Sequence, residues 1–419
     1  MSFRPAFVRV PATAALLLAL AGCGGAAGNA RLDSVEASGD GTLRVGLILD
    51  STGAQEFLSD SQLAAAQLAV REINTTGGHK GKAVELLPRS AGDSEAQATA
   101  LVAAKADVVI GPTDSSHAAS AIDVLSAARI PLISPANSAA GLSNYKSGGY
   151  YFRTAAADVA QASVLVKLAK DKGAKNLAIV HQDSSYGKDV SAAVATAAAG
   201  AGLDTTSTSA FEPGEAQQAA TSASKGAPDA VVLIAREGAQ GAIAELNNAG
   251  LSGGKIILSD GAFGQFGSGL GSKALDGARA VVPGVFPSAD FQARLLAVDS
   301  QLKDLSFAAE TFDAVTLAVL AAAAADDDGG RSIAANLIAV SGGTAPGSEA
   351  KRAAVPCSTY KDCVSSLRTG STANYDGQSG PINFDANGDV TSANFMVFTY
   401  GEDNMAKLSG RESSGRAAG

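Results

Sequence analysis

The side chains that could do chemistry in this sequence are mainly hydroxyls and carboxylates that follow apolar runs. Three histidines and three cysteines among 419 residues leave little material for a metal cluster or a thiol relay. His181 stands beside Asp183 and Ser184, but adjacency in sequence does not build a catalytic triad, and no G-x-S-x-G motif occurs. We interpret this segment as a polar loop after a strand. We therefore expect a protein that is not an enzyme, with no cofactor and no metal.

An acidic run at Asp326-Asp327-Asp328 resembles part of a calcium loop. It lacks the alternating ligands and the closing glutamate that such a loop needs. We interpret the run as a solvated helix end.

Two polar positions follow predicted strands. Ser115 and Ser116 come after the apolar run DVVIG at a helix start, where free backbone N–H groups favour an anion. Ser115 could equally cap its own helix. Asp260 follows the run KIILS, and open α/β sheets bind ligands at the carboxyl ends of their strands. The alternative for Asp260 is a cap on the turn at Asp260-Gly261.

The elements that position these residues alternate between β-branched runs and alanine-rich segments of helical period. That alternation predicts an α/β fold with parallel sheets covered by helices. It occurs as two series, which predicts two Rossmann-like lobes. The first series has predicted strands at 43–49, 83–88, 107–111 and 130–134 and helices at 60–74, 94–105 and 116–128. The second has strands at 176–181, 203–209, 229–235 and 255–259 and helices at 159–172, 187–199, 216–225 and 239–249. Residues 288–340 are predicted to be helical, and 380–385 and 394–400 to be late strands that join one or both sheets.

The N-terminus has the pattern of an export signal. Arg4 and Arg9 precede an apolar run of about 11 residues, which is too short to span a bilayer, and Leu-Ala-Gly-Cys23 follows. That ending resembles a bacterial lipobox, which implies lipid on Cys23. Cys357 and Cys363 then remain as a pair, and in an exported protein they are expected to form a disulfide, the alternative being two free thiols.

The order of motifs resembles the type I periplasmic solute-binding proteins, in the leucine/isoleucine/valine-binding branch. The motifs include VGLILDSTG, DVVIGPTDSSHAAS, IPLISPANSAAGL, YYFRT, LAIVHQDSSYG and GPINFDANGDV. The resemblance implies two lobes joined by a hinge of three crossings, expected near Arg153, Pro283 and Gly380. The expected organisation is a signal peptide at 1–22, a flexible tether at 23–42, lobe 1 at 43–153 with 284–380, lobe 2 at 154–283 with 381–404, and a disordered tail at 405–419.

The same resemblance assigns roles to residues of this sequence. In lobe 1, Ser115, Ser116, Ala136 and Ser138 match positions that hold a ligand's carboxylate and ammonium, although Asn137 departs from the usual small residue. In lobe 2, Tyr186 matches a ring that closes over the ligand and Asp260 an acid that pairs with the ammonium. Arg236 either recognises an acidic or amide ligand or is a solvated surface arginine. Phe57 or Leu58 is expected to line the pocket.

The expected function is capture of an amino acid or related small polar solute for an ABC transporter permease. The chain is expected to be a monomer, exported and lipid-anchored at the outer face of the cytoplasmic membrane. A sensor lipoprotein using the same pocket is the alternative, and an enzyme or a structural envelope protein is a third. The net charge of −9 and the lack of a basic run argue against nucleic acid as a partner.

Overall fold

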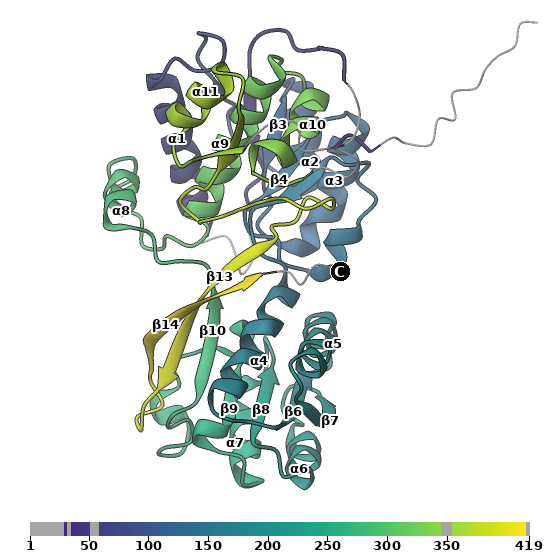
Figure 1. The fold of residues 1–419 in the computed structure, drawn as a ribbon, viewed down its shortest axis with the longest axis vertical. Coiled ribbons are helices and arrows are strands. Elements are labelled where there is room, and N and C mark those ends of the chain that lie inside the picture. The colour runs from purple at the N-terminus through teal and green to yellow at the C-terminus, as the bar shows by residue number, and fades with distance from the viewer. Residues whose placement is uncertain (1–28, 32–34, 51–57, 345–353, 416–419) are drawn as a thin grey trace, which may run out of the picture.

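The structure is a computed structural model that describes residues 29–31, 35–50, 58–344 and 354–415. Two α/β lobes lie one above the other along the long axis (Figure 1). Lobe 1 contains a five-stranded sheet of order β2-β1-β3-β4-β5, and all of its strand pairs are parallel. Lobe 2 contains a seven-stranded sheet of order β14-β13-β10-β9-β8-β6-β7. The predicted fold class, two Rossmann-like lobes, is confirmed.

The elements agree with the predicted alternation. Those of lobe 1 are β1 (Arg44–Leu47), α1 (Ser59–Thr75), β2 (Glu85–Leu86), α2 (Ser94–Ala103), β3 (Val108–Ile110), α3 (Ala118–Ala127), β4 (Leu132–Ser134), β5 (Tyr151–Arg153), α8 (Ala289–Leu296), α9 (Ala308–Ala325), α10 (Gly330–Val340), β11 (Ala354–Cys357), α11 (Tyr360–Arg368) and β12 (Thr372–Tyr375). Those of lobe 2 are α4 (Gln161–Asp171), β6 (Asn176–Gln182), α5 (Ser185–Gly200), β7 (Asp204–Phe211), α6 (Gln217–Lys225), β8 (Ala230–Ile234), α7 (Ala239–Asn248), β9 (Ile256–Leu258), β10 (Arg279–Pro283), β13 (Ser392–Tyr400) and β14 (Ala406–Gly415).

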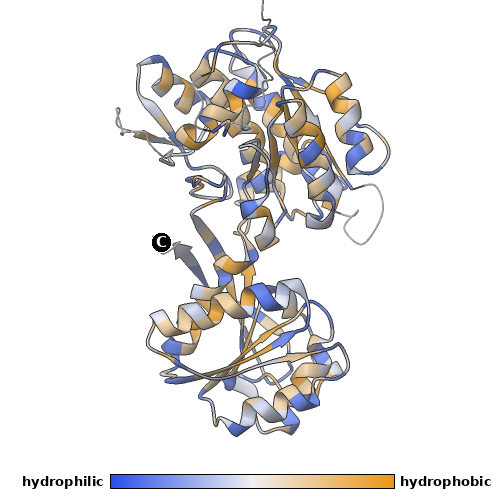
Figure 2. Ribbon diagram, turned by 90° about the vertical axis from the view of Figure 1, so that its right-hand side faces the viewer, coloured by the Kyte–Doolittle hydropathy of each residue, from blue (hydrophilic) through white to orange (hydrophobic). Residues whose placement is uncertain are grey.

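The central strands read as continuous apolar runs because both faces of each sheet are covered by helices. β3, β4, β8 and β9 are buried along their whole length. Figure 2 shows hydrophobic residues concentrated in the strands, whereas the helices carry both hydrophobic and hydrophilic residues. By length and composition α9 could cross a membrane, but 78% of it is buried inside lobe 1. It is the central helix of the lobe 1 core.

The chain passes between the lobes three times. The first two crossings follow β5 and β10, close to the predicted Arg153 and Pro283. The third was expected near Gly380, but Ile382 and Phe384 belong to the lobe 1 core, and the chain crosses only just before β13. Residues 380–385 form isolated bridges instead of the predicted strand.

The C-terminal segment corrects another expectation. Residues 405–419 were predicted to be a disordered tail, but Ala406–Gly415 forms β14, which pairs antiparallel with β13 at the edge of the lobe 2 sheet. Its sequence is polar and has no apolar alternation, so the pairing comes from backbone hydrogen bonds to an available neighbour.

The segment expected to be a flexible tether also packs on lobe 1 where it is described. Ala30 is buried and its N–H donates to Gly148 O at 2.8 Å, and the Arg31 guanidinium lies 4.7 Å from the centre of the Phe152 ring. Burial lowers the pKa of Arg31 to about 10. Cys23 and the rest of the signal segment lie outside the described residues.

The acidic run after α9 holds the next part of this segment. The Asp327 carboxylate accepts the N–H groups of Ser38 and Gly39 at 3.1 and 2.9 Å, and Asp328 accepts that of Gly41. Both aspartates are buried, whereas Asp326 is exposed. The predicted solvated helix end is therefore wrong for Asp327 and Asp328, which fix the entry of the chain into β1.

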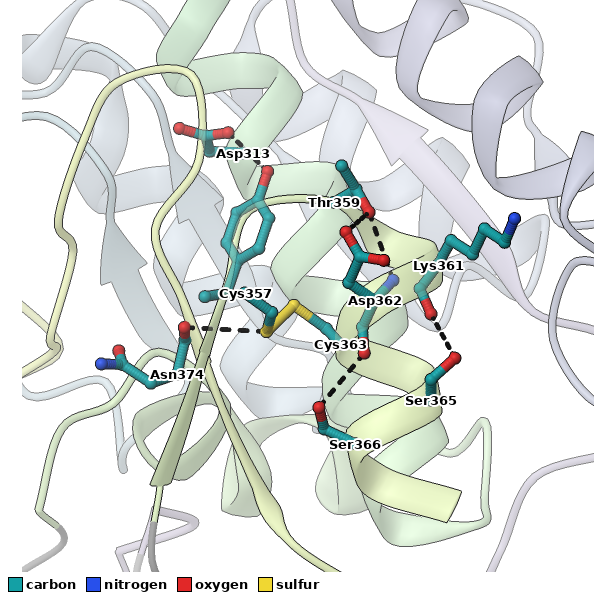
Figure 3. The surroundings of a disulfide bond; sticks show 10 residues. Asp313, Cys357, Thr359, Lys361, Asp362, Cys363, Ser365, Ser366 and Asn374 are labelled. Carbon is teal, nitrogen blue, oxygen red and sulfur yellow. Dashed lines mark hydrogen bonds between the residues drawn. A yellow bond between two sulfur atoms is a disulfide. The ribbon is translucent and has the colours of Figure 1, made fainter. Parts of the chain in front are cut away.

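The predicted disulfide between Cys357 and Cys363 is present, with the two Cα atoms 5.3 Å apart. It joins the end of β11 to the first turn of α11 (Figure 3). Both cysteines belong to the lobe 1 core. The Thr359 hydroxyl caps α11 by accepting the Asp362 N–H at 3.2 Å. Neither cysteine lines the cavity described next.

Candidate functional site

A cavity of about 510 Å³ lies between the lobes. Both lobes and the crossings contribute to its wall, at the carboxyl ends of parallel strands, where open α/β sheets bind ligands. The residues from lobe 1 are Leu58, Thr113, Asp114, Ser115, Ala136, Ser138, Phe307 and Glu310. Those from lobe 2 are Arg236, Asp260 and Gly261, and the crossings add Thr154, Ala155, Ala156, Pro283, Gly284, Val390, Ser392, Ala393 and Asn394, among others.

The loop after β3 places Ser115 on the cavity wall but not Ser116. Asp114 caps the following turn, since its Oδ1 accepts the Ser116 N–H at 2.8 Å and the Ser116 hydroxyl at 2.7 Å. Ser116 is exposed and does not line the cavity, so its predicted placement is wrong. Capping likewise belongs to Asp114 and not to Ser115.

Ser115 connects two loops of lobe 1. Its Oγ accepts the backbone N–H groups of Ser138 and Ala139 at 3.1 and 3.3 Å. This contact fixes the loop after β4 against the loop after β3. Ala136 and Ser138 thereby reach the cavity wall as predicted.

Asn137, the residue that departs from the resemblance, is fully buried and faces away from the cavity. Its Nδ2 donates to the carbonyls of Pro112 and Thr113, both at 3.0 Å, and its Oδ1 accepts from the Tyr151 hydroxyl at 3.2 Å. The asparagine therefore ties β5 and the two lobe 1 loops together, and its size does not obstruct the cavity.

Asp260 is held on the lobe 2 wall by side chains. Gln161 Nε2 donates to Asp260 Oδ1 at 2.6 Å, and the Tyr186 hydroxyl donates to the same oxygen. Gln161 Oε1 in turn accepts the Asp260 N–H at 3.1 Å. Because the carboxylate bonds side chains of α4 and α5, the alternative that Asp260 caps its own turn is wrong. Among the described residues, none donates to Oδ2.

Tyr186 orients the Asp260 carboxylate from within lobe 2. Its side chain is buried and does not line the cavity, contrary to the prediction of a ring that covers the ligand. Burial and the Asp260 carboxylate raise the pKa of Tyr186 well above its usual value. Tyr186 is thus a neutral donor that orients the carboxylate.

Arg236 lines the cavity but is neither free nor simply solvated. Its Nη2 lies 3.1 and 3.0 Å from the two carboxylate oxygens of Asp158, and its guanidinium stacks 4.4 Å above the Tyr186 ring. Burial raises the pKa of Asp158 to about 6, although Arg236 acts in the opposite direction. Asp158 therefore compensates the charge of Arg236, whose Nη2 also donates to Ser138 Oγ on lobe 1 at 3.5 Å.

His181 is a buried residue near the end of β6, and the polar loop interpreted from the sequence follows the strand at Asp183 and Ser184. Ser184 caps α5 by accepting the Gly187 N–H at 3.1 Å, and Asp183 pairs with Lys188 at 2.5 Å. His181 Nδ1 lies 3.0 Å from the Gln182 carbonyl oxygen. These side chains face separate partners.

Sequence reasoning missed Asp158, Gln161, Phe307 and Glu310. Asp158 and Gln161 lie on the crossing from β5 into α4, and Phe307 and Glu310 lie at the start of α9. The one available signal was Glu310, a charged residue in the first turn of a helix that is mostly apolar. Phe57 lies outside the described residues, whereas its alternative Leu58 lines the cavity.

Comparisons with known proteins agree with this architecture. A family model described as periplasmic binding protein matches residues 42–401. A Leu/Ile/Val-binding protein of Rhizobium johnstonii is 30% identical over 178 residues, which cover 41% of this chain and 48% of that protein. A Leu/Ile/Val-binding protein homolog of Brucella suis is 26% identical over 160 residues, covering 35% and 40%. The chain thus matches about half the length of these curated relatives.

Solved structures share the fold. A putative branched-chain amino acid ABC transporter protein from Rhodospirillum rubrum matches with a TM-score of 0.67 and 19% identity, over 88% of this chain and all of that one. A branched-chain amino acid transporter substrate-binding protein from Streptococcus pneumoniae, in complex with isoleucine, matches with a TM-score of 0.57 and 22% identity, over 89% and 99%.

The matched family is one of solute-binding proteins, so the expectation that the chain is not an enzyme is confirmed. The family implies a location outside the cytoplasm. The fold predicted from the motif order is also that of the solved structures. With a cavity between two α/β lobes and a family match over residues 42–401, the chain belongs to the periplasmic binding protein family.

Proposed function

We propose that the chain captures an amino acid between its lobes and delivers it to the permease of an ABC transporter. The observation that carries the proposal is Asp260, a carboxylate on the cavity wall with one oxygen oriented by Tyr186 and Gln161. An oriented carboxylate suits an ammonium group, and the loops at Ser115 and Ser138 offer hydroxyls to the carboxylate of the same ligand.

Hinge closure is the proposed mechanism. A ligand that moves the population from mostly open to mostly closed must prefer the closed state by roughly 10⁴-fold, about 5.5 kcal/mol. Contacts with one lobe alone do not distinguish the two states. Both walls of the cavity are therefore needed, and the crossings after β5 and β10 are where the backbone would rotate.

Export and lipid attachment at Cys23 are part of the same proposal, supported by the Leu-Ala-Gly-Cys ending of the N-terminal signal. Metabolic labelling with a fatty acid tests them. We expect label on the wild-type chain and none on Cys23→Ser. Equal labelling of both would contradict the anchor without affecting the binding proposal.

A thermal-shift screen tests the binding itself. The probes are the common amino acids, simple amides, urea and short aromatic acids, applied to residues 23–419 with Cys23→Ser so that no lipid is attached. A ligand at 100 times its Kd stabilises the native state by about 2.7 kcal/mol. We expect a shift with one or more amino acids that Asp260→Asn removes. A shift only with ligands that lack an ammonium would contradict the proposal.

A further inference from the structure

The charged groups on the cavity wall differ in whether the protein supplies them with partners. Arg236 is paired with Asp158, Asp114 accepts two bonds from Ser116, and Asp260 accepts from Gln161 and Tyr186. Glu310 is the exception. Apart from its own backbone N–H, its carboxylate has no ion pair and no donor among the described residues.

The backbone of Glu310 is held in place by its contacts, even though its carboxylate has no side-chain partner within the part of the chain that the structure describes. It lies in the first turn of α9, and its carbonyl accepts the Thr154 hydroxyl at 2.9 Å. A Cβ placed on Gly284 would lie 3.6 Å from Glu310 Oε1, so the carboxylate is beside the second crossing. Thr154 and Gly284 both belong to crossings, which sets Glu310 at the base of the cavity between the lobes.

The surroundings of Glu310 disfavour its charge. Burial, with a contribution from Asp313 one turn further along α9, raises its pKa to about 7. The other charged residues that line the cavity are Asp114, Asp260 and Arg236, and Arg236 is paired with Asp158, so no unpaired cation faces Glu310 among the described residues. An ionised carboxylate that is partly buried and unpaired destabilises the protein unless a ligand supplies a hydrogen-bond donor or a cation.

We propose that Glu310 receives a second cationic nitrogen of the ligand, so that the site takes an amino acid with a basic side chain. This inference rests on the proposed function. Asp260 on the lobe 2 wall would bind the α-ammonium, and Glu310 on the lobe 1 wall the side-chain cation. The cavity of about 510 Å³ lies within the range typical of small-molecule sites. The two carboxylates then act from opposite lobes, as closure requires.

The experiment compares three probes that differ in the side chain: L-arginine, its neutral near-isostere L-citrulline, and L-leucine. Calorimetric titration is carried out on residues 23–419 with Cys23→Ser, alone and with Glu310→Gln. Glu85→Gln, a substitution of an exposed glutamate on β2, is the matched control. Melting temperatures verify that each variant is folded.

We expect L-arginine to bind at least 30-fold more tightly than L-citrulline, and Glu310→Gln to reduce that ratio at least tenfold with little change for L-citrulline. The control should retain the full ratio. Tighter binding of L-leucine than of L-arginine, unaffected by Glu310→Gln, would overturn the role of Glu310 and leave the proposed function intact. Binding of no amino acid would overturn both.

Discussion

The two walls of the cavity hold their polar groups in different ways. In lobe 1, Ser115 on the cavity wall and the buried Asn137 bond to backbone groups of adjacent βα loops. On the lobe 2 wall, Asp260 and Arg236 bond to the side chains of Gln161, Tyr186 and Asp158. The polar surface of lobe 1 is therefore determined by the conformation of its loops. The charged side chains of lobe 2 are instead held in place by hydrogen bonds to neighbouring side chains.

This difference indicates which wall controls affinity and which controls shape. Charged groups held by side chains can be altered one at a time and report directly on ligand charge. Hydroxyls held through the backbone act together, because losing one loosens a whole loop. Glu310 is the exception on lobe 1, being a charge without a partner.

The largest expected effect is that of Asp260→Asn. It keeps a hydrogen-bonding side chain beside Gln161 and Tyr186 but removes the charge, and losing one partner of a desolvated ion pair costs roughly 2–5 kcal/mol of binding. Titration with the ligand found in the screen should show affinity reduced by roughly 100-fold or more. Asp204→Asn, on the exposed start of β7, is the control. Unchanged affinity in Asp260→Asn would remove the ammonium assignment.

The second effect comes from the matched pair Ser115→Ala and Ser116→Ala. Ser115→Ala leaves two N–H groups of the loop after β4 without their acceptor, which destabilises the binding conformation of this loop by about 1–2 kcal/mol. Because the loop carries Ala136 and Ser138, binding should weaken by roughly tenfold. Ser116→Ala loses contact only with Asp114 and should bind as the wild type does. The assignment fails if the Ser116 variant is the weaker binder in the same titration.

The third prediction concerns stability in the absence of ligand. The folded-state pKa of Glu310, about 7, lies above its ordinary value of 4.5, so its destabilising effect is present above pH 7 and disappears as the pH falls toward 4.5. Glu310→Gln should raise the melting temperature at pH 8 by roughly 2–4 °C, for a gain of about 1 kcal/mol, and by less at pH 5.

Burial also raises the pKa of Asp107 to about 7 and that of Asp158 to about 6, so the wild-type pH profile alone is not diagnostic. The difference between wild type and Glu310→Gln isolates Glu310, because both proteins share the other two groups. A difference that is the same at pH 5 and pH 8 would show that the carboxyl is not the source.

The smallest expected effect is that of Arg236→Gln. Since Asp158 compensates the arginine, affinity for a basic or apolar amino acid should change by less than about threefold, under about 0.7 kcal/mol. The informative case is L-glutamate as a probe. If the wild type binds L-glutamate and the variant loses it by tenfold or more, Arg236 acts on the ligand and the proposed division between the walls is wrong.

The fold could be predicted where buried parallel strands occur as apolar runs in the sequence. β3, β6 and β8 are such runs, and their order established both lobes. β14 could not be predicted, because a polar edge strand is specified by the neighbour it pairs with. The third crossing was misplaced for a similar reason, since residues 382–390 join the lobe 1 core only through distant contacts.

The candidate site was predictable where a residue follows a strand. Ser115, Ala136, Ser138, Arg236 and Asp260 all do, and all line the cavity. Glu310 and Phe307 come from the start of a helix that begins 25 residues after the end of β10, and Gln161 and Asp158 from the crossing after β5. Residues that are brought to the cavity by a later crossing of the chain between the lobes carry no local sequence pattern that identifies them.

The packing of Ala30 and Arg31 on lobe 1 limits how far lobe 1 could lie from a membrane to which the chain is anchored. With lipid on Cys23, as proposed, only five residues separate the anchor from Asn29, and the six Cα–Cα steps from Cys23 to Asn29 reach about 20 Å when fully extended. Lobe 1 would then stay close to the bilayer, with lobe 2 as the part that swings. Such a short tether would confine the search for the proposed permease to the plane of the membrane and would raise the effective concentration of each protein for the other.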